Sequence, residues 1–182
     1  MKILKSCLFS LTLVVSCTLA GCSASSTKSV GVSDSIRASL DKAGYKDVSV
    51  SQDRDKGVVT LGGHVAADSD KSQAEIIAKT IAESQVVSNQ IAVLPLGAES
   101  DAKRMNSDLD NGIESNLSAA LIKNKLHESV HYAVKNHVVT LTGEVDSQMK
   151  RARAEKVASA VVNVQQVVNE LQVKGQKVTS SQ

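Results

Sequence analysis

One segment of this chain occurs twice, and this repeat limits the folds that the chain can adopt. Residues 58–65 read Val-Val-Thr-Leu-Gly-Gly-His-Val, and residues 138–145 read Val-Val-Thr-Leu-Thr-Gly-Glu-Val. The register then holds without a gap, so that 13 of 36 positions are identical between 58–93 and 138–173. Self-similarity of this kind indicates one small structural unit used twice. Both copies keep their apolar spacing and one glycine, but they share no set of reactive side chains, which argues against an enzyme.

Apolar periodicity predicts the same order of elements in each copy: helix, strand, strand, helix, strand. Val59, Leu61 and Val65 alternate as they do along a half-buried strand. Apolar residues then recur at the spacing of one helix face, at Ala74, Ile77, Ala78 and Ile81. The expected fold class is therefore α+β, with two tandem αββαβ domains. Each domain is expected to be a small three-stranded mixed sheet packed against two helices.

A glycine recurs inside the same predicted strand of both copies, as Gly63 and Gly143. Glycine weakens a strand interior, so its return in both copies predicts a bulge or a close approach of another backbone segment.

Composition along the chain predicts where the domains begin and end. Residues 23–32 are small and polar, which is typical of a flexible link, and Pro95 and Gly97 mark a connection between the copies. The expected organisation is a signal peptide at 1–21, a lipidated tether at 22–32, a first domain at 33–94, a linker at 95–106, a second domain at 107–174 and a polar tail at 175–182.

The amino terminus has the features of a secretory signal: Lys2 and Lys5 precede a short apolar run that is too brief for a transmembrane helix. The sequence Leu-Ala-Gly-Cys at 19–22 resembles the lipobox of bacterial lipoproteins. That resemblance implies that Cys22 is the first mature residue and carries acyl chains, palmitate among them. Ser23 in place of an aspartate implies, by resemblance to sorted envelope lipoproteins, the periplasmic leaflet of the outer membrane. The alternative is an ordinary signal peptide with a chance cysteine at the cleavage site.

Removal of the signal changes what the composition implies. Without Lys2 and Lys5 the chain has 19 basic and 19 acidic residues, and Cys22 is its one remaining cysteine. A formally neutral chain whose aromatic residues are Tyr45 and Tyr132 is a poor nucleic-acid binder. A disulfide within the chain and a second thiol for catalysis or metal binding are also excluded.

The repeated pattern resembles the BON domain, a family named for bacterial osmotically inducible and nodulation proteins. The matching features are the two Val-Val-Thr-Leu-x-Gly-x-Val strands, the Ala-Glu-x-x-Ala helices that follow them, and the Val-x-Asn-x-[Ile/Leu]-x-Val ends. Two such units behind a lipobox resemble dual-BON outer-membrane lipoproteins over about residues 33–174. The family often has a glycine before the last strand, where this chain has Ser84-Gln85 and Val164-Gln165. The resemblance implies non-enzymatic binding to phospholipid or envelope partners that supports the envelope under stress.

Two features of the second copy are candidates for membrane contact. The first is a basic cluster expected at the start of a helix, where cations oppose the helix dipole; its members are Lys150, Arg151, Arg153 and Lys156. Contact with anionic phospholipid headgroups is one interpretation, and a solvated helix face is the other.

The second candidate is a helix expected at 107–125, which is more apolar than one small sheet requires. Its residues expected to contact lipid are Ile113, Leu117, Leu121, Lys123 and Lys125. A core helix with favourable terminal lysines is the alternative.

No cofactor or metal site is expected. His127, His131 and His137 have no cysteine or carboxylate at ligand spacing, and neither a nucleophile elbow nor a phosphate loop is present. The expected function is that of a non-enzymatic lipoprotein that binds phospholipid at the outer membrane. The competing expectation is a structural adaptor that binds an envelope protein. The sequence leaves the oligomeric state open.

Overall fold

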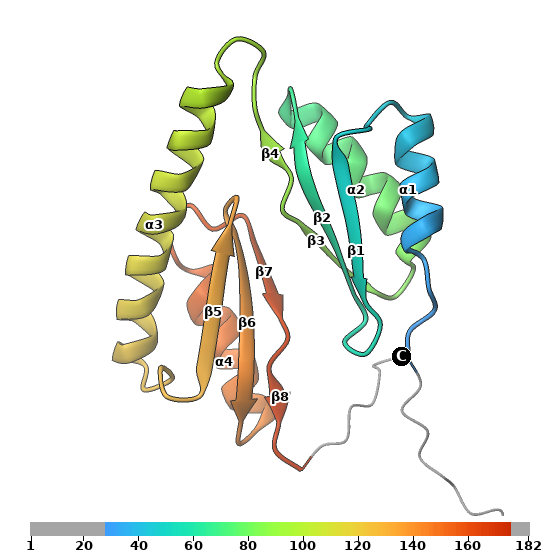
Figure 1. Ribbon diagram of the computed structural model, residues 1–182. Coiled ribbons are helices and arrows are strands. Elements are labelled where there is room, and N and C mark those ends of the chain that lie inside the picture. The colour runs from blue at the N-terminus through green and yellow to red at the C-terminus, as the bar shows by residue number, and fades with distance from the viewer. Residues whose placement is uncertain (1–27, 176–182) are drawn as a thin grey trace, which may run out of the picture.

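The structure, a computed structural model, describes residues 28–175 as two units of the same design (Figure 1). The first unit contains α1 (Ser33–Lys42), β1 (Val48–Asp53), β2 (Val58–Val65), α2 (Asp68–Ala82), β3 (Val86–Asn89) and β4 (Ala92–Val93). The second contains α3 (Glu99–Lys123), β5 (Val130–Lys135), β6 (Val138–Val145), α4 (Gln148–Ser159), β7 (Gln166–Asn169) and β8 (Gln172–Val173). The predicted α+β class and the tandem arrangement are confirmed.

Each sheet is built around the strand that carries the repeated motif. In the first unit β1 pairs antiparallel with β2 on one side, and β3 and β4 pair parallel with β2 on the other. The second unit repeats this topology around β6. The expected three-stranded mixed sheet is therefore present, with its third strand broken into two short pieces.

The core of each unit lies between the sheet and its two helices. In the first unit Val59 and Leu61 of β2 pack against Ala74 and Ala78 of α2, and all four side chains are fully buried. The second unit has the equivalent arrangement. The small alanines bring the helix close to the sheet, so that valine, leucine and isoleucine can fill a core without large aromatic residues.

The repeated glycines sit where a side chain has no room, which confirms the predicted close approach. Gly63 has a φ of +83°, and a Cβ there would lie 1.9 Å from the carbonyl oxygen of Asp47. Gly143 has a φ of +120°, and its Cβ would lie 2.5 Å from the carbonyl oxygen of Ser129. Both positive φ values lie in a region that favours glycine.

An asparagine that is identical in both copies holds the break in the third strand. The side-chain nitrogen of Asn89 donates to a carboxylate oxygen of Glu75 at 2.9 Å and to the Lys71 carbonyl at 3.2 Å. The side-chain oxygen of Asn89 accepts a hydrogen bond from the backbone amide of Ile91. Asn169 makes the same three contacts in the second unit, with Glu155, Arg151 and Leu171. The identical Asn and Glu residues thus join a helix to the strand break in each unit.

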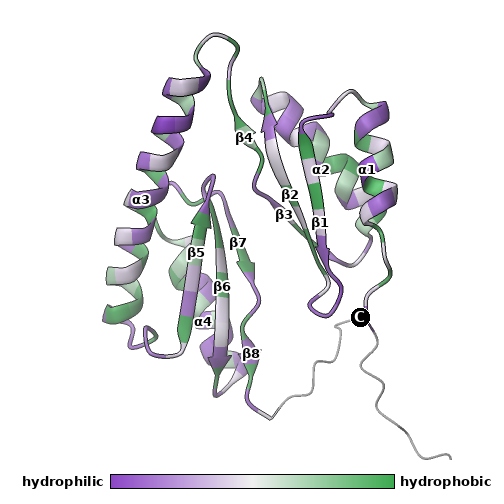
Figure 2. Ribbon diagram, viewed as in Figure 1, coloured by the Kyte–Doolittle hydropathy of each residue, from purple (hydrophilic) through white to green (hydrophobic). Residues whose placement is uncertain are grey.

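The second unit's first helix differs from the prediction. α3 runs from Glu99 to Lys123, so most of the expected linker at 95–106 is helical. In Figure 1 the amino-terminal half of α3 extends past the β5–β6 turn, beside β4. Figure 2 shows that this half is largely hydrophilic, whereas the carboxy-terminal half, which covers the second sheet, is more hydrophobic. Charged residues such as Lys103 and Arg104 gave the segment the composition of a linker, although they are good helix formers.

The β5–β6 connection is a tight two-residue turn. Asn136 and His137 have φ values of +47° and +66°, as in the two-residue turns of β-hairpins. The Asp110 carboxylate of α3 accepts hydrogen bonds from both of their amides, at 2.7 and 2.8 Å. One side chain therefore fixes the position of α3 relative to the hairpin.

The two units pack directly on one another through equivalent strands. Val58 of β2, Val138 of β6 and Val168 of β7 form a small buried cluster between the sheets. Val58 and Val138 occupy the same position of the repeat, on the side of the strand opposite the unit's own core. The linker therefore does not separate two independent domains.

Polar groups complete this interface at the edge of the first sheet. The Gln166 side chain donates to the Val87 carbonyl at 2.7 Å and accepts a hydrogen bond from the backbone amide of Asn89 at 3.0 Å. The Gln166 side chain thereby makes hydrogen bonds that a neighbouring strand would otherwise make with the free edge of β3. The Asn136 side chain donates to the Gln90 carbonyl at 2.7 Å.

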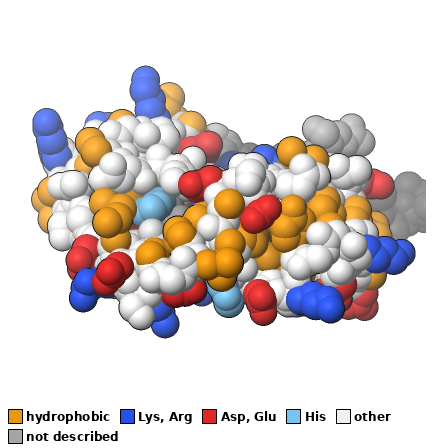
Figure 3. Space-filling model, turned by 90° about the horizontal axis from the view of Figure 1, so that it is seen from above, with side chains coloured by type: hydrophobic (Ala, Val, Ile, Leu, Met, Phe, Trp, Pro, Cys, Tyr) orange, Lys and Arg blue, Asp and Glu red, His pale blue; other side chains and the backbone are white. Residues whose placement is uncertain are grey.

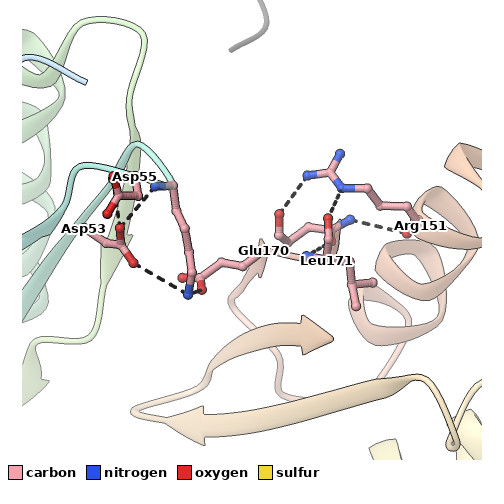
Figure 4. A network of polar contacts seen from close by, with 7 residues as sticks. Asp53, Asp55, Arg151, Glu170 and Leu171 are labelled. Carbon is pink, nitrogen blue, oxygen red and sulfur yellow. Dashed lines mark hydrogen bonds and ion pairs between the residues drawn. The ribbon is translucent and has the colours of Figure 1, made fainter. Parts of the chain in front are cut away.

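An ion pair joins the β1–β2 hairpin to the second unit (Figure 4). Lys56 Nζ lies 2.5 Å from a carboxylate oxygen of Glu170 and 3.6 Å from Asp53. The hydrogen bond from Lys56 to Glu170 raises the pKa of the lysine above its usual value, and the charges of Glu170 and Asp53 add to this effect against the opposing effect of partial burial. The ammonium is therefore charged across the physiological range.

Candidate functional site

Four basic side chains from two segments line one hollow in the second unit. The hollow has a volume of about 350 Å³ and lies where the end of α3 meets the start of α4. Its lining residues are Lys123, Asn124, Lys125, Leu126, Lys150 and Arg153. The sequence placed the two lysines of α3 and the basic residues of α4 in separate candidates, and the structure brings them together. We call this site the basic hollow.

The end of α3 holds Lys125 in a conformation that lysine rarely adopts. The Leu126 amide donates to the Leu121 carbonyl and the Lys125 amide donates to the Ile122 carbonyl, which are the two bonds of a Schellman motif. Leu126 is buried beside Leu121, and this apolar contact closes the motif. Lys125 takes the left-handed position with a φ of +56°. The first unit has Gly44 at that position, with a φ of +93°.

The start of α4 supplies the other two cations. Ser147 caps the helix by accepting a hydrogen bond from the Lys150 amide at 3.2 Å. Arg153 donates to the side-chain oxygen of Asn124 at 3.2 Å, which ties α4 to the end of α3. The first turn of α4 contains no acidic residue, whereas the first turn of α2 contains two. Cations near a helix amino terminus cost a few tenths of a kcal/mol each, so this arrangement is not explained by helix stability.

One carboxylate stands beside the basic hollow. Asp146 lies 2.5 Å from Lys150 Nζ and 3.8 Å from Lys174 Nζ. The hydrogen bond from Lys150, together with its charge, lowers the pKa of Asp146 below its usual value. Asp146 thus neutralises part of the charge of the hollow in the absence of an anion.

Two members of the predicted basic cluster lie elsewhere. Arg151 donates to the carbonyls of Leu171 at 2.9 Å and Asn169 at 2.8 Å, so its guanidinium supports the break between β7 and β8 (Figure 4). Lys156 lies in the last turn of α4, where it is exposed and suits the helix dipole. The expectation that all four residues form one cluster at the helix start is wrong, because the Arg151 guanidinium is bonded to backbone carbonyls and Lys156 lies in the last turn of α4.

The apolar members of the predicted α3 site belong to the core. Ile113, Leu117 and Leu121 are at most 1% exposed and pack against the second sheet. Their expected contact with lipid is therefore wrong for the folded unit. The apolar stripe is wide because α3 covers a whole sheet, which is the alternative that the sequence left open.

A second hollow, of about 320 Å³, lies between the carboxy-terminal part of α3 and β5. Its lining residues are Ser118, Leu121, Ile122, His127, Val130, His131 and Tyr132. Ile122 is 56% exposed, although it is a large apolar residue. Two of the histidines that the sequence singled out therefore line an open groove. Across residues 28–175, no group of three or more His, Cys, Asp or Glu side chains is placed to hold a metal ion.

The opposite end of the molecule has a different character. Figure 3 views the end at which α3 begins, and its hydrophobic side chains spread across the middle while charges of both signs lie around the rim. Within the described part of the chain, no helix is both long enough and apolar enough to cross a membrane. Lipidation of Cys22 falls outside the residues that the structure describes.

The interface between the units was missed by the sequence reasoning. A signal for it exists, because two consecutive valines at 58–59 and again at 138–139 break the alternation of a half-buried strand. The first valine of each pair contacts the other unit, and the second contacts its own core.

Comparison with known proteins agrees with this architecture. The BON domain matches residues 30–95 and 109–175, one match for each unit. The chain is 32% identical over 142 residues to osmotically-inducible protein Y of Escherichia coli (strain K12), and the match covers 76% of this chain and 69% of that protein.

Two solved structures of CdsD, a structural protein of the type III secretion system of Chlamydia trachomatis, are also similar. One is 14% identical, with a TM-score of 0.32, and the match covers 78% of this chain and 65% of that chain. The other is 12% identical, with a TM-score of 0.36, and covers 76% and 90%. With both units matched by the same domain, this chain belongs to the BON-domain family.

Proposed function

We propose that this protein is a non-enzymatic envelope lipoprotein that holds an anionic membrane surface through the basic hollow. The similar protein of Escherichia coli is named as osmotically inducible, and we extend a role in osmotic stress to this chain. The lipobox-like sequence at Cys22 and the following Ser23 support attachment to the periplasmic leaflet of the outer membrane.

The observation that carries this proposal is the convergence of Lys123, Lys125, Lys150 and Arg153 on one hollow. Two of these residues stand where a different residue type suits the fold better: Lys125 occupies a glycine position, and Lys150 lies in the first turn of a helix. Residues that oppose local stability are often retained for function. Lipid phosphates are anions that such a cluster would attract.

The magnitude of this attraction explains why a lipid anchor is needed. A basic residue near an anionic bilayer contributes about 1 kcal/mol, so four contribute about 4 kcal/mol, which corresponds to a Kd of about 1 mM. Such a contact is weak in free solution. Attachment at Cys22 would keep the hollow near the bilayer and convert the contact into an intramolecular event with a high effective concentration.

Vesicle flotation of the soluble mature chain, residues 23–182, tests the proposal. We expect binding to vesicles that contain phosphatidylglycerol, weaker binding as salt rises, and little binding to phosphatidylcholine alone. Lys123→Gln with Lys125→Gln is expected to weaken binding about 30-fold, at about 1 kcal/mol per residue. The control is Lys103→Gln with Arg104→Gln, which makes the same charge change at the other end of α3. Equal loss in both variants would refute a localised site.

The groove between α3 and β5 favours a second candidate, a structural adaptor for an envelope protein. Ile122 is exposed beside this groove, and β5 pairs with β6 alone among the described strands, which leaves its other edge open to an added strand. Crosslinking in intact cells from Ile122→Cys distinguishes the two functions. A single heavy protein adduct, with no vesicle binding in vitro, would support the adaptor and not the membrane contact.

A further inference from the structure

The amino-terminal segment of the described chain is fastened to the first unit before α1 begins. The Ser29 amide donates to the Arg54 carbonyl at 2.9 Å, and Arg54 Nε donates to the Ser29 carbonyl at 2.7 Å. Lys28 forms an ion pair with Asp55 at 3.2 Å. Residues 28–32 were expected to belong to a flexible tether, and the structure instead places them along the β1–β2 hairpin.

Two glutamines hold the same segment from the side. The Gln52 amide donates to the Val30 carbonyl at 2.7 Å and to the Gln85 side chain at 2.6 Å, while its oxygen accepts from the Val32 amide at 3.0 Å. Gln85 also donates to the Val30 carbonyl, at 3.1 Å. We call Gln52, Arg54 and Gln85 the clamp.

The clamp shortens the link to the expected lipid. A chain that is free from Cys22 to Ser33 could extend about 37 Å, but a chain that is fastened at Lys28 can extend only about 20 Å. In Figure 1 the β1–β2 turn, along which residues 28–32 lie, and the carboxy-terminal end of α3, where the basic hollow lies, are both towards the lower end of the molecule. A short link at that end therefore brings the hollow towards the bilayer.

The hairpin that holds the clamp also holds the second unit. Lys56 of this hairpin pairs with Glu170, and Gln166 bridges to β3 next to it in the same interface. The first unit, which holds residues 28–32, is therefore packed against the second unit, which carries the basic hollow.

We propose that Gln52, Arg54 and Gln85 are positioning residues that fix the direction of the lipid link, so that the basic hollow faces the bilayer. This inference rests on the proposed membrane contact and on lipidation at Cys22. It assigns a role to residues that lie far from the hollow in the sequence.

The test measures which end of the lipidated protein lies near the membrane. A cysteine introduced at Glu128, beside the hollow, or at Ser100, at the other end of α3, carries a fluorophore, because Cys22 is blocked by lipid. The protein is reconstituted into phosphatidylglycerol vesicles with a headgroup-located quencher. We expect severalfold stronger quenching at Glu128→Cys than at Ser100→Cys.

Release of the clamp is expected to remove most of this difference. The variant is Gln52→Ala, Arg54→Ala and Gln85→Ala, and the matched control is Gln73→Ala, Arg104→Ala and Gln172→Ala. A glycine–serine insertion between Thr27 and Lys28 lengthens the link without touching the clamp, and it should have a similar effect. Equal quenching at both positions in the parent, or an undiminished difference in both the clamp variant and the insertion, would overturn the inference.

Two further measurements separate this inference from the proposed function. Slow hydrogen exchange at the Ser29 and Val32 amides is expected in the parent and should be lost in the clamp variant, and fast exchange in the parent would refute the clamp itself. Flotation of residues 23–182 should be unchanged in the clamp variant, because the hollow is intact. Failure of the parent chain to float would refute the headgroup contact, whatever the exchange result.

Discussion

At the scale of single residues, the two units differ most clearly where Lys125 replaces glycine. Gly44 and Lys125 end the first helix of their units with equivalent hydrogen bonds, and both have a positive φ. Glycine adopts this conformation without strain, whereas other L-residues lose about 1–2 kcal/mol. Stability of the second unit therefore does not explain the lysine, and we propose that contact with an anion does.

Lys125→Gly is expected to raise the free energy of unfolding by about 1 kcal/mol and to weaken vesicle binding about fivefold. Lys123→Gly is the matched control, because it removes the same charge from inside the helix and should destabilise by about 1 kcal/mol. Urea unfolding and flotation of both variants check the result. A Lys125→Gly variant that binds vesicles as well as the parent would remove Lys125 from the site.

Gly63 shows the opposite case, in which the fold alone determines the residue. Gly63→Ala is expected to cost about 2–4 kcal/mol, because the new Cβ meets the Asp47 carbonyl in a region of positive φ. Gly112→Ala on the exposed face of α3 has open space around its Cβ and should stabilise by about 0.5–1 kcal/mol. Thermal unfolding of the two variants should shift in opposite directions, and a neutral Gly63→Ala would contradict the close approach.

At the scale of elements, the sequence predicted the types and order of the helices and strands better than the contacts that their side chains make. The spacing of apolar residues in the helix at 68–82 and their alternation along β2 predicted which side chains form the core, because burial of one face imposes both patterns. The basic residues of α4 could not be sorted in this way. Whether Arg151 reaches a bilayer or the carbonyls of Asn169 and Leu171 depends on a strand that follows eighteen residues later.

This division of α4 predicts different effects for neighbouring arginines. Arg151→Ala is expected to destabilise by about 1.5–3 kcal/mol, because two carbonyls lose a charged donor, with little direct effect on headgroup contact. Arg153→Ala should leave stability within about 0.5 kcal/mol and weaken vesicle binding about fivefold. Urea unfolding and flotation, each measured on both variants, check this. The reverse pattern would reassign the two residues.

The link between α2 and the strand break predicts an acid sensitivity of the first unit. Partial burial alone would raise the pKa of Glu75, but hydrogen bonds from Asn89 and Lys79 and the nearby lysine charges outweigh it and lower the pKa below 4.5. This contribution to stability is present above pH 4.5 and is lost as the pH falls through the lower, folded pKa. Asn89→Ala should therefore destabilise by about 2 kcal/mol at neutral pH and reduce the fall in stability between about pH 5 and 3. Unfolding curves across this range check it, and an unchanged pH dependence would contradict the role of Asn89.

At the scale of the whole molecule, the two units pack on one another, and the basic hollow lies at one end of the second unit. Val58 and Val138 are identical in the repeat, yet the residues around them differ between the copies: Gln166 corresponds to Val86, and Glu170 corresponds to Gln90. Gln166 and Glu170 thereby supply contacts between the units that Val86 and Gln90 of the first unit do not match. The sequence could not reveal this pairing, because a valine that faces away from its own core does not show which surface it packs against.

The clamp and the interface between the units both involve the β1–β2 hairpin. The fastened segment at 28–32 enters beside the β1–β2 hairpin, and Lys56 of the same hairpin contacts the second unit. Under the proposed function, the first unit positions the membrane contact that the second unit makes.

The most direct test of this account is to map the surface that touches anionic vesicles. Backbone amide signals of isotope-labelled residues 23–182 are followed by nuclear magnetic resonance while phosphatidylglycerol vesicles are added, with phosphatidylcholine vesicles as the control. The account predicts that signals change and broaden first at Lys123–Leu126 and Lys150–Arg153, while those at Glu99–Asn106 stay in place. Changes that begin in the first unit or in the amino-terminal half of α3, with the basic hollow unaffected, would contradict it.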